Sequence, residues 1–133
     1  MIHHCHAHGC TAIIPAAKFV CPMHWRRLGG PFKAAILREY KRGQEVTKTP
    51  SLRYMAVQRA AVATLAFKPD DEKAARAAAP YYLESQMWRQ LAIDAGDGDP
   101  LDGIHSAHVR IDETETARII GCIRAEARAL GEL

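Results

Sequence analysis

No run of 18 consecutive apolar residues occurs in the sequence, and a helix needs about that many to cross a bilayer. The first ten residues, MIHHCHAHGC, also lack the positively charged region and apolar stretch that open a secretory signal peptide. We therefore expect a cytoplasmic protein without membrane association. In a reducing cytosol, clustered cysteines are more often metal ligands than disulfide partners.

The common catalytic motifs are missing as well. The sequence has no Gly-rich phosphate loop, no GxSxG elbow, no dinucleotide fingerprint and no HExxH. No glutamate lies within its cluster of cysteines and histidines, so that cluster lacks the base that zinc hydrolases and deaminases use. A histidine–metal nuclease would need a second catalytic histidine and an asparagine, and neither is placed for that role. We expect no enzymatic activity and no small-molecule substrate.

Large apolar side chains are scarce. Aromatic residues make up 7% of the chain, and much of the 48% hydrophobic fraction is alanine, which buries little area per residue. A chain of 133 residues has the size of one domain. Small domains with thin cores are often stabilised by a metal ion.

Three of the four cysteines and three of the seven histidines lie in one short stretch, CHAHGCTAIIPAAKFVCPMHW, residues 5–25. The spacing Cys5-x4-Cys10-x10-Cys21-x2-His24 supplies two pairs of ligands. A Cys3His set is a standard closed zinc site, without an open position for a catalytic water. We therefore expect one structural zinc ion bound by these four residues, and no catalytic residue.

The identity of the imidazole ligand stays open at this point. His24 completes a paired spacing with the preceding cysteine, whereas His6 and His8 lie close enough to the first two cysteines to replace it. Trp25 follows the last ligand directly, and we expect it to pack as a lid on the zinc module rather than to stack on a nucleobase.

The net charge of +3 conceals an uneven distribution along the chain. Residues 1–68 contain eleven Lys and Arg against two acidic residues, a net charge of +9, whereas residues 69–133 contain seven against thirteen, a net charge of −6. A positive half is typical of a surface that faces a polyanion. The alternative is that the halves neutralise each other within the fold or across a homodimer. The residues expected to contact nucleic acid are Arg26, Arg27, Lys33, Arg38, Lys41, Arg42 and Arg53.

The hydrophobic spacing and the turn signals predict a mainly α fold, in which an N-terminal zinc knuckle with a short β-hairpin is followed by about four helices. The knuckle spans residues 1–30, and residues 31–133 form a helical region packed on it within a single domain. The expected helices cover residues 31–43, 52–67, about 70–95 with an interruption or kink at Pro80, and 112–130.

Helix starts and core positions can be assigned from the same pattern. Ser51, the pair Asp70 and Asp71, and Asp112 are expected at helix N-termini. The side chains expected to face the core are Phe32, Ile36, Leu37 and Tyr40 on the first helix, and Leu52, Met55, Ala56, Val62, Leu65 and Ala66 on the second. An aromatic group of Tyr81, Tyr82 and Trp88 is also expected in the core.

Three features of the C-terminal half carry no recognisable chemistry. The loop DAGDGDPLDG, residues 94–103, fails the ligand pattern of an EF-hand and is expected to be a solvated turn. His105 and His108 have no recognisable catalytic partner. Cys122 is expected to be a buried, small apolar residue of the last helix.

The N-terminal half resembles a group of small zinc-binding proteins carried by bacteriophages and prophages. The shared features are a CHxxGC-type start, a CxxHW pair and a helix that ends near YxxGQE, and they cover about residues 5–66. The residues that match are Cys5, His6, Gly9, Cys10, Cys21, His24, Trp25, Tyr40, Gly43, Gln44 and Glu45. The resemblance implies a phage or prophage source, residence in the cytoplasm of a bacterial host, and the same four zinc ligands. It implies little about activity.

Two functions agree with these observations. The first is a non-catalytic, zinc-stabilised accessory protein that binds DNA, RNA or a host nucleoprotein complex through its basic N-terminal half. The alternative is a phage-encoded inhibitor of a host defence or regulatory complex, similar to anti-CRISPR proteins, that binds protein through its acidic C-terminal half.

Overall fold

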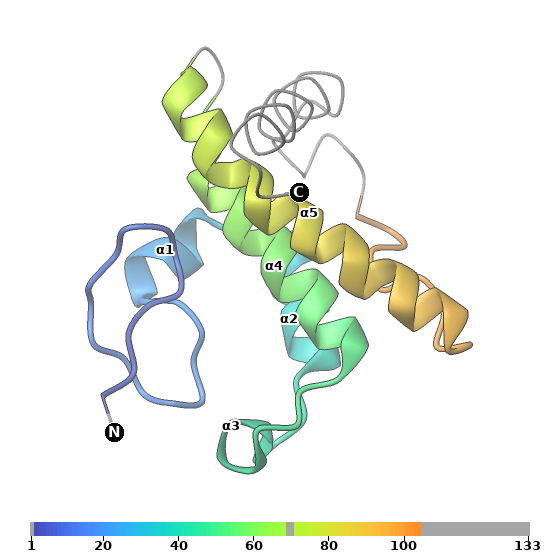
Figure 1. Ribbon diagram of the computed structural model, residues 1–133. Coiled ribbons are helices and arrows are strands. Elements are labelled where there is room, and N and C mark those ends of the chain that lie inside the picture. The colour runs from blue at the N-terminus through green and yellow to red at the C-terminus, as the bar shows by residue number, and fades with distance from the viewer. Residues whose placement is uncertain (1, 69–70, 105–133) are drawn as a thin grey trace, which may run out of the picture.

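The computed structural model describes residues 2–68 and 71–104 of the chain. These residues form five α-helices and no β-strand, which confirms the prediction of a mainly α fold for the described part. The helices are α1 (Pro22–Arg27), α2 (Gly30–Glu39), α3 (Gln44–Thr47), α4 (Leu52–Ala66) and α5 (Glu72–Asp94). Figure 1 shows α4 and α5 as a long antiparallel pair, with the N-terminal loop and α1 to one side of it.

The predicted β-hairpin does not form among the described residues. A single antiparallel bridge joins His4 to Ile13, flanked by one hydrogen bond on each side. The pairing stops at one end because Cys10 donates back to the carbonyl of Ala7 in a tight turn, where Gly9 has a positive φ of 76°. It stops at the other end where Pro15, which has no N–H, follows Ile14. The N-terminal segment is therefore a looped knuckle.

Two short helices were not predicted. α1 begins at Pro22. Proline suits the first turn of a helix because the N–H groups of that turn have no intrahelical acceptor, so the lack of an N–H costs no hydrogen bond. α3 is a single turn within the expected loop 44–50, between Gly43 with a φ of 88° and Lys48 with a φ of 57°. Both helices are too short to show the repeating spacing of apolar residues by which a helix is predicted from sequence.

Helix α2 ends earlier than the expected 31–43, because Tyr40 turns to an extended conformation after Glu39. Phe32 and Ile36 are buried as predicted, with exposed fractions of 0% and 5%. The prediction for Leu37 is wrong, since this side chain is 67% exposed. Within the described residues, the buried side chains of α2 pack in the same core as α4 and the N-terminal loop, and this buried stripe is narrower than the apolar spacing suggests.

Helix α4 is the centre of the molecule. It begins as predicted at the N-cap Ser51, whose hydroxyl accepts a hydrogen bond from the N–H of Tyr54. Most of its residues are buried, because α2 and the N-terminal loop cover one side and α5 covers another. Of the residues expected to face the core, Ala56, Val62 and Leu65 are buried, and Leu52, Met55 and Ala66 are half-buried.

Helix α5 runs from the N-cap Asp71 to Asp94, close to the predicted limits, and continues through Pro80. Alanines line its contact with α4 and let the two helices approach closely. Ser85 is fully buried there and donates a hydrogen bond of 2.7 Å to the carbonyl of Ala56. The expected aromatic group is only half-buried, at Tyr81, Tyr82 and Trp88.

Several predictions concern residues outside the described part of the chain. They are the helix over 112–130 that starts at Asp112, the roles of His105, His108 and Cys122, and the place of Asp70 at the start of α5. None of the described helices combines the length and the apolar character that a bilayer span requires.

Candidate metal centre

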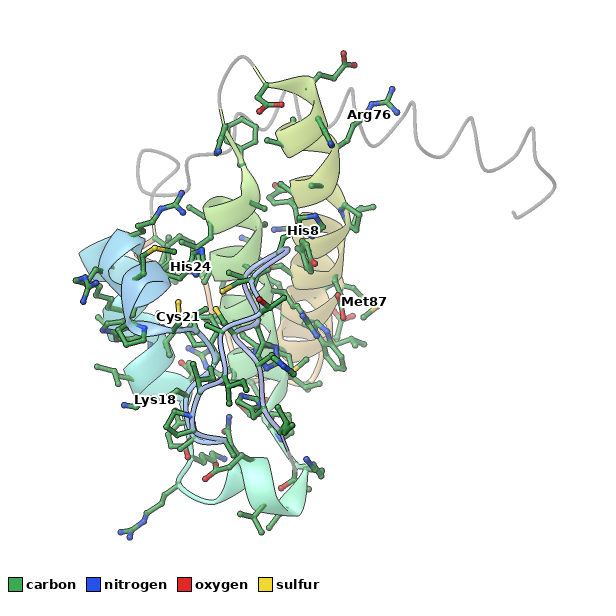
Figure 2. All side chains as sticks on the ribbon, turned by 90° about the vertical axis from the view of Figure 1, so that its left-hand side faces the viewer. His8, Lys18, Cys21, His24, Arg76 and Met87 are labelled. Atoms are coloured by element: carbon green, nitrogen blue, oxygen red, sulfur yellow. The ribbon has the colours of Figure 1, made fainter. Side chains whose placement is uncertain are left out.

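Four side chains converge at the N-terminal knuckle. Their ligand atoms, the sulfurs of Cys5, Cys10 and Cys21 and a ring nitrogen of His24, all lie within 4.8 Å of one another. The first two come from the looped segment, and the other two from the N-cap and first turn of α1. Figure 2 shows Cys21 and His24 beside each other where α1 meets the N-terminal loop. The three cysteines are free thiols and form no disulfide.

The spacing of these atoms suits a single ion. Nδ1 of His24 lies 3.2 Å from the sulfur of Cys21 and 3.6 Å from the sulfur of Cys5. A tetrahedral ion with zinc–ligand bonds of about 2.3 Å to sulfur and about 2.0 Å to nitrogen places such ligand atoms about 3.5 Å apart. The donor set and its separations therefore fit a tetrahedral, thiophilic metal ion.

His24, and neither rival histidine, completes the group among the described residues. His8 instead lies 3.1 Å from the hydroxyl of Tyr81 on α5, through its Nδ1 atom. The ring of His6 lies 5.1 Å from that of His3 between centroids. Of the histidines that the sequence left open, His24 is therefore the one that the structure places with the three cysteines, because α1 brings its side chain back toward Cys21.

The protonation of the ligands depends on their surroundings. Burial raises the pKa of the Cys5 thiol, whereas a hydrogen bond from the backbone N–H of His24 lowers the pKa of Cys21. Burial, aided by the positive charge of Arg27, lowers the pKa of His24. The lowered pKa favours the neutral imidazole, which is the form that ligates a metal.

The centre is enclosed by protein. Cys5, Cys21 and His24 are at most 9% exposed, and Cys10 is half-buried. Four protein ligands complete a tetrahedral shell and leave no position for a water molecule. The centre belongs to the same core as residues of α2 and α4, including Phe32 and Val57. A metal here would join the N-terminal loop to the helices.

The basic residues singled out in the sequence lie in three settings. Arg26 and Arg27 on α1 are exposed, and so are Arg38, Lys41 and Arg42 at and beyond the end of α2. Lys33 is half-buried, with its Nζ atom 6.0 Å from the centre of the Trp25 ring. Arg53 is half-buried on α4 and engaged with acidic and backbone groups of the fold.

Arg53 joins three parts of the molecule. Its guanidinium donates to both carboxylate oxygens of Glu39 at 2.9 to 3.0 Å and to the carbonyl of Asp97 at 2.6 Å. Arg38 adds a bond of 2.9 Å to the same carboxylate. Burial alone would raise the pKa of Glu39, but these hydrogen bonds more than offset it, so that the pKa lies below the ordinary 4.5. The sequence offered no signal for this pairing, because Glu39 and Arg53 lie on different helices.

The Glu39 pairing predicts a pH-dependent contribution to stability. A carboxylate whose pKa is lowered in the folded state stabilises that state above its ordinary pKa, and loses the effect as the pH falls through the folded value. We expect Glu39→Gln to lower the free energy of unfolding by about 1–3 kcal/mol at pH 7, with the loss shrinking below about pH 4. Urea titrations of the two proteins across this range measure the difference.

Glu72→Gln is the matched control for that prediction. Glu72 is 65% exposed and lies 3.8 Å from Arg76 at the start of α5, so its loss should change stability by less than about 0.5 kcal/mol. Equal effects of the two substitutions at pH 7 would contradict the role assigned to Glu39.

Besides the bond from Arg53 to the carbonyl of Asp97, the side chain of Asp99 connects the loop after α5 to the rest of the fold. Asp99 forms a two-pronged ion pair with Arg89, at 2.6 and 2.9 Å, and accepts the N–H of Leu101. The neighbouring acids Asp94, Asp97 and Asp102 are exposed. No acidic group of the described residues joins a second candidate metal cluster.

Comparisons with models of protein families, with curated proteins and with solved structures found no match to this chain. The function is therefore inferred from the geometry of the metal centre and from the charged surface around it.

Proposed function

We propose that the chain is a non-catalytic accessory protein of phage type that holds one structural zinc ion and binds nucleic acid, or a nucleoprotein, through its basic N-terminal half. The observation that supports it most is that exposed cations lie on the helix that carries the ligand His24 and at the end of the next helix. Arg26 and Arg27 follow the ligand His24 within the same short helix, and Arg38, Lys41 and Arg42 follow at the end of the next one.

Zinc is the metal we assign, because three thiolates and one imidazole in a tetrahedral arrangement are its common structural ligands. The ion would bind Cys5, Cys10, Cys21 and His24 and stabilise α1. Since α1 has only six residues, it needs such support to hold its arginines in place. The metal thus contributes to function by positioning charge, without taking part in a reaction.

The exposed cations suit the phosphate backbone. α2 alone spans about 15 Å, a length that covers more than one phosphate group of a strand, and cations precede and follow it in the chain. No acidic group is paired with Arg26, Arg27, Lys41 or Arg42 in the interactions of the described residues. They are therefore free to replace counterions on a polyanion.

The expected result for the proposal is salt-sensitive binding. Fluorescence anisotropy with labelled DNA and RNA should show affinity that falls steeply between about 50 and about 200 mM salt. The double variant Arg26→Ala/Arg27→Ala should weaken binding and lower the slope of log K against log salt by about 2 for duplex DNA.

The double variant Lys68→Ala/Lys73→Ala is the control. It removes the same charge from two exposed residues at the other end of the α4–α5 pair, and should leave the salt slope unchanged. Equal losses in both double variants would mean that only net charge matters, and absence of binding at the lower salt would reject the proposed function.

The second candidate is a phage-encoded, protein-binding inhibitor of a host defence or regulatory complex, and one observation favours it. Asp94, Asp97 and Asp102 are exposed at the end of α5 and in the loop beyond it, and their negative charge suits a basic surface of a host protein. If no nucleic acid binds at low salt, this function takes the first place, and Asp94→Asn/Asp97→Asn is the variant that should abolish association with the host complex.

A further inference from the structure

An apolar groove of about 520 Å³ lies between the segment that precedes α1 and helix α2. Its walls include Phe19, Trp25, Leu37, Tyr40 and Tyr54, and Lys18 lies at its edge. Leu37 is 67% exposed, while Trp25 and Tyr40 are half-buried, so part of this apolar surface faces solvent. In Figure 2, Lys18 lies at the margin of the molecule below Cys21.

A second hollow of about 540 Å³ adjoins the groove and shares Lys18, Phe19, Tyr40 and Tyr54 with it. Exposed Lys48 lines this second hollow. Glu45 also lines this hollow, and its carboxylate accepts a hydrogen bond of 2.5 Å from the hydroxyl of Tyr40. Each hollow falls in the size range of small-ligand sites, and the two are lined by aromatic side chains and by Lys18 and Lys48.

The groove and the proposed phosphate-binding cations are interleaved along the chain. Trp25, Leu37 and Tyr40 line the groove. Each is followed directly in the chain by one of the proposed cations, Arg26, Arg38 and Lys41, and these three side chains are exposed. Alternating aromatic walls and cations are the arrangement by which proteins bind single strands, with bases stacked on rings and phosphates held by charge. In a duplex the bases are stacked inside the helix and cannot enter a groove.

We propose that this groove accepts unpaired bases, so that the preferred ligand is single-stranded nucleic acid. The inference rests on the proposed function and narrows its substrate class. Lys18 and Lys48, which line the two hollows, hold the phosphates, and one or more bases insert between the Tyr40 and Trp25 sides of the groove. Since every base has an aromatic face, the groove selects strand type rather than sequence.

The test compares single- and double-stranded DNA of about 16 nucleotides by anisotropy at about 50 mM salt, with the zinc-loaded protein. The measured quantity is the ratio of the two affinities, and the single strand should bind more tightly. Tyr40→Leu should lower this ratio about tenfold, because it removes an aromatic face. Tyr40→Phe also loses the hydrogen bond to Glu45 but keeps the ring, and should retain the preference.

A second measurement does not depend on Tyr40. In a Trp88→Phe background, Trp25 is the remaining tryptophan of the chain, and a base inserted beside it should quench its fluorescence. Single-stranded DNA should quench this emission, and duplex DNA should not. Met87, half-exposed on α5, supplies Met87→Leu as the control substitution away from the groove (Figure 2).

The outcomes separate the two proposals. Equal affinity for both strand types, unchanged in Tyr40→Leu and without quenching of Trp25, overturns the groove inference while the proposed function stands. Absence of binding to either strand type overturns both.

Discussion

Removal of the metal should unfold the N-terminal knuckle, residues 1–30. A structural zinc site of this type contributes on the order of 10 kcal/mol of binding free energy, and that free energy is available only to the folded knuckle. No regular β-structure among the described residues of the knuckle could substitute for the metal as a source of stability. The β-pairing there is limited to the single bridge between His4 and Ile13. Chelation should therefore expose Trp25, which the fluorescence of a Trp88→Phe variant reports.

The histidines provide a matched pair for this prediction. His24→Ala should lose the bound metal, measured as zinc per chain, and should show the unfolded knuckle in the same assay. His8→Ala removes an equal side chain whose ring contacts Tyr81 instead, and should retain one zinc per chain. Retention of zinc by His24→Ala with loss in His8→Ala would show that the ligand assignment is wrong.

The Phe32→Ala variant should be the most destabilising single substitution outside the metal centre. Phe32 has an exposed fraction of 0% and lies in the core that joins the knuckle, α2 and α4. Truncation of a buried phenylalanine costs about 3–5 kcal/mol, from lost burial and from the cavity that remains. Chemical denaturation of the zinc-loaded protein should show this loss as a lower midpoint.

Leu37→Ala is the control on the same helix. Leu37 is 67% exposed, so its truncation should change the free energy of unfolding by less than about 0.5 kcal/mol. If Phe32→Ala cost no more than Leu37→Ala, the core that couples the knuckle to the helices would not contribute as the packing indicates.

The convergence of four side chains able to hold a metal could be predicted from the sequence, because such sites depend on spacing within a short stretch. Cys5, Cys10, Cys21 and His24 lie at intervals that one loop and one turn of helix can close. Choosing between His24 and the nearby histidines needed the structure, since the short helix α1 gives no periodic signal of its own. The zinc ion itself remains our assignment.

The long helices were predictable for similar reasons. Ser51 and Asp71 mark the starts of α4 and α5 through local side-chain caps, which any chain with those residues can form. The β-hairpin was wrongly inferred from short runs of β-favouring residues. The burial of Leu37 was wrongly inferred because the apolar residues of α2 cover a wider face of the helix than the face that packs against the core.

Charge along the chain was less informative than charge in space. The count over residues 1–68 treats every cation alike, whereas Arg53 is bound to Glu39 inside the fold and Arg59 lies 3.4 Å from Glu84. Ion pairs between helices depend on how the helices pack, so they cannot be predicted from a local sequence pattern. The cations of α1 and of the segment after α2 stay exposed, and the proposed nucleic-acid contacts rest on them.

X-ray absorption at the zinc edge tests the central claim most directly, because it counts and identifies the atoms bound to the metal. We predict a shell of three sulfur atoms at about 2.3 Å and one nitrogen at about 2.0 Å, with no oxygen. Such a shell describes a closed centre that positions α1 and its arginines. A shell containing a water oxygen and fewer sulfurs would contradict this account, because the metal would then have an open position for chemistry.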